Sequence, residues 1–66
     1  MYVIKINKRK EAKFDNTIRD LVYENKIYVN SLEDGYVKEK RNAKHYETKE
    51  VALSAVSEEW EMVVKA

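Results

Sequence analysis

The segment FDNTIRDLVYE, residues 14–24, decides which fold the chain can adopt. Its apolar residues recur at the spacing of a single helical face, and they are Phe14, Ile18, Leu21 and Val22. This spacing predicts an amphipathic helix over the segment. Asp15 or Asn16 can cap the first turn of this helix, and Asn25 can end it in the left-handed conformation.

The same segment also permits a strand, which would change the topology. Residues 17–23 could run extended and turn at residues 24–26 into a following strand. We favour the helix because the apolar spacing fits a period of 3.6 residues.

Extended segments lie on both sides of this helix. Residues 2–6, YVIKI, alternate between two faces and are rich in β-branched and aromatic side chains, which predicts a strand. Residues 27–29 and 36–38 predict two further strands that run antiparallel to each other. A tight turn at residues 33–35 is expected between them, because Gly35 can adopt the positive φ that such turns need.

The last third of the chain predicts a second helix and a closing strand. Thr48 is a good helix cap, and the residues after it form an apolar face of Ala52, Leu53, Val56 and Trp60. We expect Trp60 to lie in the core with Leu53 and Val56 as its partners. Residues 60–65 alternate as a strand does, and a short extended stretch is expected at residues 45–46.

These elements predict an α+β fold with a mainly antiparallel sheet of about four strands and one or two short helices. The preferred order is strand, helix, strand, strand, helix, strand, which is that of a split βαβ unit. A meander plus one helix is the alternative if residues 14–24 form a strand. The chain has no proline, one glycine and no linker-like segment, so a single domain over residues 1–66 is expected.

Composition excludes several classes of protein. The 66 residues include no cysteine and one histidine, so a disulfide framework and a cysteine-ligated zinc site are excluded. The net charge of +1 fits neither a DNA mimic nor a strongly basic nucleic-acid binder. No apolar run approaches the roughly 18 residues of a membrane span, and Lys5 interrupts any signal-peptide pattern. We expect a soluble, cytoplasmic protein without a cofactor or membrane partner.

The charges are segregated along the chain. Residues 1–13 contain five basic residues and one acidic residue, and residues 38–49 contain five and two. Acidic residues collect at positions 33–34 and 58–61. Segregated charge suits a partner or a second copy, and we expect a homodimer because so small a domain buries little of its own surface.

No residue pattern favours catalysis. His45 is the only histidine, and Glu47 lies on the same side of an extended segment, but an exposed histidine at a strand edge is the simpler interpretation. The acidic residues at 58–61 are interpreted as a solvated surface, and no metal site is expected. The sequence therefore predicts a protein that is not an enzyme.

Tyrosine and basic residues around the predicted hairpin form the candidate binding site. Tyr28 and Tyr36 flank the hairpin and are expected to be cross-strand neighbours, with Lys38, Lys40 and Arg41 close by. Tyrosine and arginine are enriched among the residues that dominate protein interfaces. We therefore predict that these five residues contact a protein partner.

A nucleic-acid site is the alternative for the same surface. It would use Tyr28 and Tyr36 to stack on bases, and Lys8, Arg9 and Lys10 to contact phosphates. Such binding would weaken steeply as the salt concentration rises, because released counterions drive phosphate binding.

Three segments carry a resemblance to known proteins. They are residues 1–6 (MYVIKI), residues 43–52 (AKHYETKEVA) and residues 62–65 (MVVK). Their succession resembles that of small accessory proteins encoded by phages of low-GC Gram-positive bacteria. The resemblance implies an N-terminal strand, a hairpin, a capped helix and a last strand. It also implies a binding protein that inhibits a host or defence-system protein.

Overall fold

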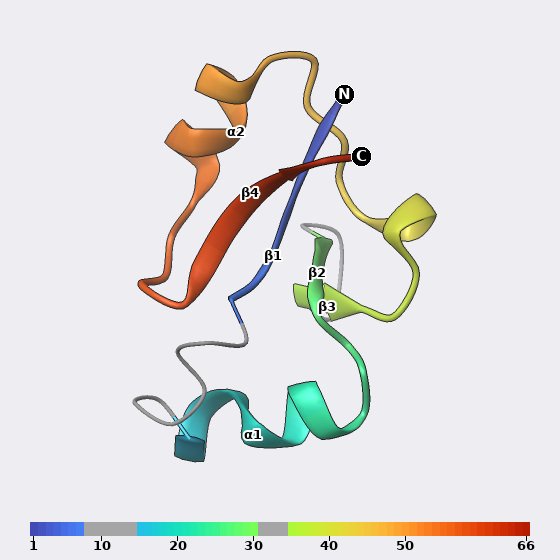
Figure 1. Cartoon of the computed structure of the whole chain (residues 1–66), viewed down its shortest axis with the longest axis vertical. Helices are drawn as coiled ribbons and strands as arrows, with labels where there is room; N and C mark the ends of the chain where they lie inside the picture. Colours follow the sequence, from blue (N-terminus) through green and yellow to red (C-terminus); the bar gives the residue numbers. More distant parts are fainter. Residues whose placement is uncertain (8–14, 31–34) are drawn as a thin grey trace.

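The computed structural model describes residues 1–7, 15–30 and 35–66 (Figure 1). Its elements follow in the order β1 (Tyr2–Ile6), α1 (Asp15–Tyr23), β2 (Tyr28–Asn30), β3 (Gly35–Val37), the 3-10 turn η2 (Lys40–Asn42), α2 (Lys49–Ala55) and β4 (Glu61–Lys65). The predicted α+β fold and its preferred order of strands and helices are confirmed. Residues 15–23 form α1, so the alternative strand over residues 17–23 is wrong. Phe14 of the predicted apolar face and residues 33 and 34 of the predicted turn lie outside the described residues.

The four strands form one antiparallel sheet in the order β3-β2-β1-β4. β1 pairs with β4 along its whole length, with Ile4 opposite Val63 at the centre. On its other side β1 pairs with β2, where Lys5 lies opposite Tyr28. β1 therefore joins the β2–β3 hairpin to β4.

A second backbone segment also pairs with β1, beyond the end of β2. Tyr2 and Tyr46 form an antiparallel bridge in which the backbone nitrogen of each donates to the carbonyl oxygen of the other at 2.8 Å. The stretch predicted to be extended at residues 45–46 is therefore paired at Tyr46. Because Tyr46 and β4 lie on opposite sides of β1, the chain through α2 crosses from one side of β1 to the other.

The C-terminal end of α1 and the N-terminal cap of α2 lie at the residues that the sequence predicts. Asn25 has a φ of 60°, and the backbone nitrogens of Asn25 and Lys26 donate to the carbonyl oxygens of Val22 (3.0 Å) and Leu21 (2.8 Å). This is the double hydrogen bond of a Schellman C-cap, which satisfies carbonyls that the helix leaves free. At α2 the Thr48 Oγ1 atom accepts a hydrogen bond from the backbone nitrogen of Val51 at 3.2 Å.

The buried residues include Val3 and Ile4 of β1 and Ala52 of α2, and a distinct part of the core lies between α1 and the sheet, which Figure 1 shows next to each other. The centre of this part is a cluster of three buried isoleucines, Ile6, Ile18 and Ile27. Five partly buried side chains pack against this cluster, and they are Leu21, Val22, Tyr28, Tyr36 and Trp60. Three elements of the predicted order, β1, α1 and the start of β2, thus meet in one apolar cluster.

The predicted apolar face of α2 is wrong at Leu53. Ala52 is fully buried, whereas Leu53 is 54% exposed, and Trp60 packs against the isoleucine cluster. A helix of seven residues presents about two turns, and the small Ala52 is the side chain that it buries. α2 and α1 have seven and nine residues, and no described helix is long and apolar enough for a membrane span.

The burial difference between Ile18 and Leu53 gives a test of this core. Ile18→Ala is expected to lower the free energy of unfolding by about 2–5 kcal/mol, because it removes buried methyl groups and leaves a cavity. Leu53→Ala is the matched control and should change the free energy of unfolding by less than about 0.5 kcal/mol. Urea denaturation followed by circular dichroism measures both.

Ile18→Val keeps the test informative if Ile18→Ala does not fold. Its expected loss is about 0.5–1.5 kcal/mol. Equal losses for Leu53→Ala and Ile18→Ala would contradict the placement of the two side chains.

Candidate functional site

The β2–β3 register divides the predicted binding residues between the two faces of the sheet. Tyr28 pairs with Val37, and Val29 pairs with Tyr36. Because successive side chains of a strand point to opposite faces, Tyr28 and Tyr36 lie on different faces. The prediction that these two tyrosines are cross-strand neighbours is wrong, because the residue opposite Tyr28 is Val37.

Tyr28 lies on the face that carries the basic residues of η2. The Lys40 Nζ atom lies 6.0 Å from the centroid of the Tyr28 ring, at the limit of a cation–π contact, and it donates to the Lys65 carbonyl oxygen at 3.3 Å. Lys38 and Arg41 are exposed on either side of Lys40 in the chain. We call these four residues, Tyr28, Lys38, Lys40 and Arg41, the basic surface.

Backbone hydrogen bonds hold the segment that carries the basic surface. Within η2 the nitrogens of Asn42 and Ala43 donate to the carbonyl oxygens of Glu39 (3.0 Å) and Lys40 (3.1 Å). After η2 the Lys44 nitrogen donates to the Val29 carbonyl oxygen at 3.0 Å, which attaches the segment to β2. The cations are therefore presented by a fixed turn.

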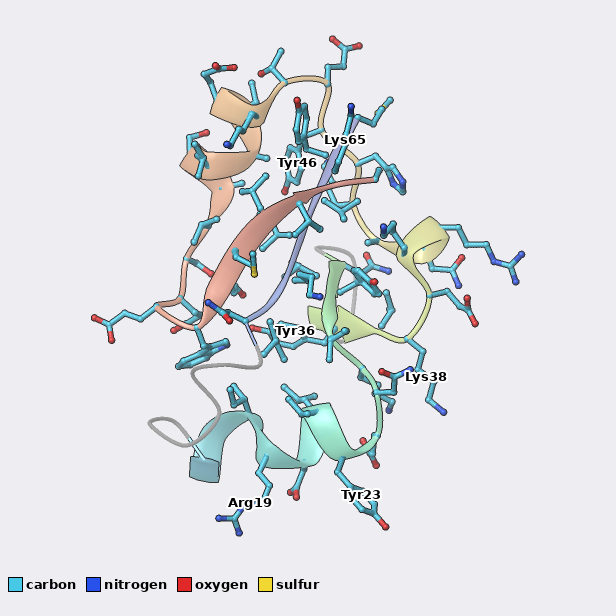
Figure 2. All side chains as sticks on the ribbon, in the orientation of Figure 1. Arg19, Tyr23, Tyr36, Lys38, Tyr46 and Lys65 are labelled. Atoms are coloured by element: carbon cyan, nitrogen blue, oxygen red, sulfur yellow. The ribbon has the colours of Figure 1, made fainter. Side chains whose placement is uncertain are left out.

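Tyr36 lies on the other face, where its hydroxyl group forms hydrogen bonds with two other side chains. It donates to Glu61 Oε2 at 2.6 Å and accepts from Trp60 Nε1 at 2.9 Å. Figure 2 shows Tyr36 among the strands, whereas Lys38 points away from the molecule. We call Tyr36, Trp60 and Glu61 the Tyr36 network.

The Glu61 carboxylate extends this network into the backbone before β4. Its Oε1 atom accepts from the backbone nitrogens of Ser57 (3.1 Å) and Glu58 (3.3 Å). One carboxylate thus fixes the turn that leads into β4 and binds a residue of β3. The sequence predicts a solvated surface for the acidic residues at 58–61. Tyr36 lies 25 residues before Glu61, and no local sequence pattern indicates a contact over that separation.

The protonation of Tyr36 follows from this environment. Burial raises the pKa of the Tyr36 hydroxyl above its ordinary value of 10.0, and the hydrogen bond to Glu61 raises it further. The hydrogen bond from Trp60 acts in the opposite direction and is smaller. Tyr36 is therefore a neutral hydrogen-bond donor across the physiological pH range.

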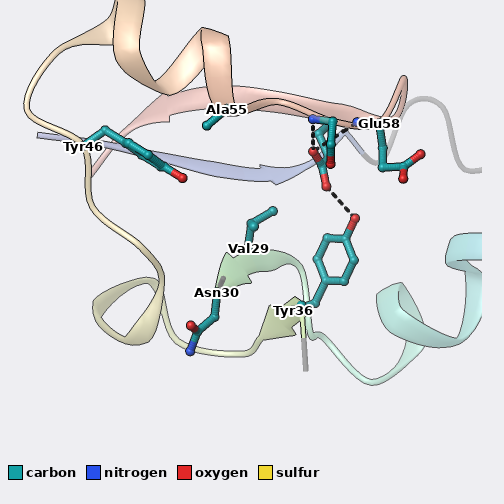
Figure 3. A pocket seen from close by; sticks show the side chains of 9 residues that line it. Val29, Asn30, Tyr36, Tyr46, Ala55 and Glu58 are labelled. Atoms are coloured by element: carbon teal, nitrogen blue, oxygen red, sulfur yellow. Dashed lines mark hydrogen bonds between the residues drawn. The ribbon is translucent and has the colours of Figure 1, made fainter. Parts of the chain in front are cut away.

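A pocket of about 390 Å³ opens beside the Tyr36 network. Figure 3 shows Tyr46 and Tyr36 at opposite ends of it, with Val29 between them. The lining residues that matter for its chemistry are Val29, Tyr36, Tyr46, Ala55, Glu58 and Glu61. The pocket therefore combines aromatic rings and carboxylates, and it lies on the face opposite to Tyr28.

The structure also places the candidates for catalysis and for metal binding. His45 is exposed, and its Nδ1 atom lies 2.8 Å from the Ala43 carbonyl oxygen, which is a backbone acceptor. Within residues 1–7, 15–30 and 35–66, no group of three or more potential metal ligands comes together. Lys8, Arg9 and Lys10 of the alternative nucleic-acid site lie outside the described residues.

The chain matches no protein-family model, no curated protein and no solved structure. Its function is therefore inferred from the chemistry of the basic surface and of the pocket. These two features lie on opposite faces of the sheet and have opposite charge.

Removal of the Tyr36 hydroxyl tests the Tyr36 network. Tyr36→Phe should lower the free energy of unfolding by about 1–2 kcal/mol, because it leaves the Glu61 Oε2 and Trp60 Nε1 atoms without their partner. Tyr23→Phe makes the same chemical change at a side chain that is 89% exposed, and it should change stability by less than about 0.5 kcal/mol. Urea denaturation at neutral pH compares them, and equal stabilities of all three proteins would contradict the network.

The raised pKa of Tyr36 predicts a loss of stability in alkali. Above pH 10.0 an unfolded tyrosine releases its proton while folded Tyr36 retains it, so the unfolded state binds fewer protons and stability falls as the pH rises. The contribution is fully present below pH 10.0. The free energy of unfolding should therefore fall more steeply above pH 10.0 in the wild-type protein than in Tyr36→Phe. Parallel curves for the two proteins would contradict the assignment.

Proposed function

We propose that the protein is a non-enzymatic binding protein whose basic surface docks on an acidic region of another protein. The observation that carries the proposal is the placement of the Lys40 ammonium over the Tyr28 ring by the η2 turn. Lys38 and Arg41, which are exposed, lie two residues before and one residue after Lys40 in the chain. Aromatic residues flanked by arginine are typical of the centres of protein interfaces.

The charges of the basic surface determine which partner it suits. Arg41 can form paired hydrogen bonds with a carboxylate, and Lys38 adds a second exposed positive charge. Lys5 lies opposite Tyr28 in the sheet and extends the positive charge onto β1. A partner with carboxylates grouped around an apolar contact would complement this arrangement.

A protein partner fits the geometry better than single-stranded nucleic acid does. Stacking on successive bases requires aromatic rings on one face, and the β2–β3 register separates Tyr28 from Tyr36. The Tyr36 hydroxyl is also engaged in the Tyr36 network. Nucleic-acid binding is therefore an outcome that the experiment below distinguishes.

The resemblance to phage accessory proteins suggests the biological setting of this proposal. In that setting the protein acts in the host cytoplasm and inhibits a host or defence-system protein by covering its acidic surface. No catalytic step is required. The segregation of charge between the two faces would also allow self-association as a homodimer.

An affinity experiment in the lysate of the bacterial host tests the proposal. The immobilised protein should retain one stoichiometric protein after nuclease treatment, as identified by mass spectrometry. Arg41→Glu and Lys38→Glu should each weaken the affinity for that protein about tenfold, because they place like charges against its carboxylates. Lys49→Glu reverses an exposed charge on α2 and is the matched control, with unchanged affinity expected.

Two results would contradict the proposal. Retention of nucleic acid with a scatter of proteins, all lost on nuclease treatment, would favour the nucleic-acid alternative. Equal losses of affinity in Arg41→Glu and Lys49→Glu would show that binding depends on total charge and does not use the basic surface.

A further inference from the structure

The pocket between Tyr36 and Tyr46 has a chemistry unlike that of the basic surface. Two carboxylates, of Glu58 and Glu61, line it together with the two tyrosines. Among the described residues that line the pocket, none is a lysine, an arginine or a histidine. A ligand that enters the pocket therefore meets acceptors and aromatic rings without a competing cation.

The carboxylates of the pocket have acceptor capacity that the protein does not use. Glu61 Oε1 accepts two hydrogen bonds, but Oε2 accepts one, from Tyr36. A carboxylate oxygen can accept two hydrogen bonds, so Oε2 has room for another donor. Among the described residues, none donates a hydrogen bond to the Glu58 carboxylate, which Figure 3 shows beyond Glu61 at the Tyr36 end of the pocket, directed outward.

The remaining walls suit the apolar part of a cationic side chain. Val29 and Ala55 provide aliphatic contact, and Figure 3 shows the Tyr46 ring directed into the pocket from the end opposite Tyr36. Aromatic faces attract cations, and a planar guanidinium can stack on them while its edge donates to carboxylates. The volume of about 390 Å³ lies within the range of small-molecule sites.

We propose that this pocket binds an organic cation, and that the guanidinium group of an arginine side chain is its best match. The guanidinium donates to Glu61 Oε2, the Glu58 carboxylate adds negative charge at the same end of the pocket, and the aliphatic stem contacts Val29. The Tyr36 network fixes Glu61 before the ligand arrives, so little ordering is needed on binding. This site does not use the basic surface, and either site can fail without the other.

Two-dimensional amide NMR with defined probes tests the pocket. N-acetyl-arginine methylamide should shift the amide signals of Val29, Tyr46 and Glu61 in a saturable manner. The citrulline analogue has nearly the same shape without the charge, and it should bind at least about fivefold more weakly. Spermidine is the third probe, and binding of spermidine at least as tight as that of the arginine probe would identify a polyamine as the source of the cation.

Two variants separate the pocket from general charge effects. Glu58→Gln keeps the shape of the side chain and removes one charge, and it should weaken binding of the arginine probe about two- to fivefold. Glu47→Gln removes an exposed carboxylate that does not line the pocket, and it should leave binding unchanged. Equal binding of the citrulline analogue, equal effects of the two variants, or no saturable shift with either cationic probe would overturn the proposal.

Discussion

The hydrogen bond between the Tyr36 hydroxyl and Glu61 joins the two edge strands of the sheet, β3 and β4, across one face. Neighbouring strands are about 4.8 Å apart, so three intervals on a flat sheet separate the edges by about 14 Å. The Tyr36 and Glu61 side chains extend towards each other across this face, and their oxygen atoms meet at 2.6 Å. Both residues line the pocket, and the same carboxylate holds the turn that begins β4. One contact between a tyrosine and a glutamate therefore links the β2–β3 hairpin to the turn before β4 and to one end of the pocket.

So small a chain needs such a contact because its apolar core is limited. The isoleucine cluster lies at one end of the sheet, and Ala52 is the buried residue of α2. A 66-residue domain buries only about 60% of the surface that its unfolded chain exposes. A partly buried network that pairs Trp60, Tyr36 and Glu61 adds stability and links β3 to β4.

The two faces of the sheet have different chemistry, and both proposed sites follow from this difference. The basic surface presents Tyr28 and Lys40 on one face, and the pocket presents carboxylates and tyrosines on the other. Lys40 and the pocket residues Glu58 and Glu61 thus lie on different faces. Each proposed site would complement a ligand of opposite charge.

The sequence by itself determined the features that depend on neighbours within a few residues. The strand at residues 2–6, the helix that ends at Asn25 and the cap at Thr48 follow from local spacing, backbone preference and single hydrogen bonds. The α+β class follows from the succession of these segments along the chain. These predictions were correct because the physical causes lie inside each segment.

Only the tertiary structure decided how the segments meet. The pairing of Tyr28 with Val37 put Tyr28 and Tyr36 on opposite faces, and packing of α2 left Leu53 exposed while Trp60 joined the isoleucine cluster. The contact of Tyr36 with Glu61 spans 25 residues, so no local pattern encodes it. Strand register and long-range hydrogen bonds depend on the simultaneous position of several elements, and for that physical reason the candidate sites became definable only in the folded chain.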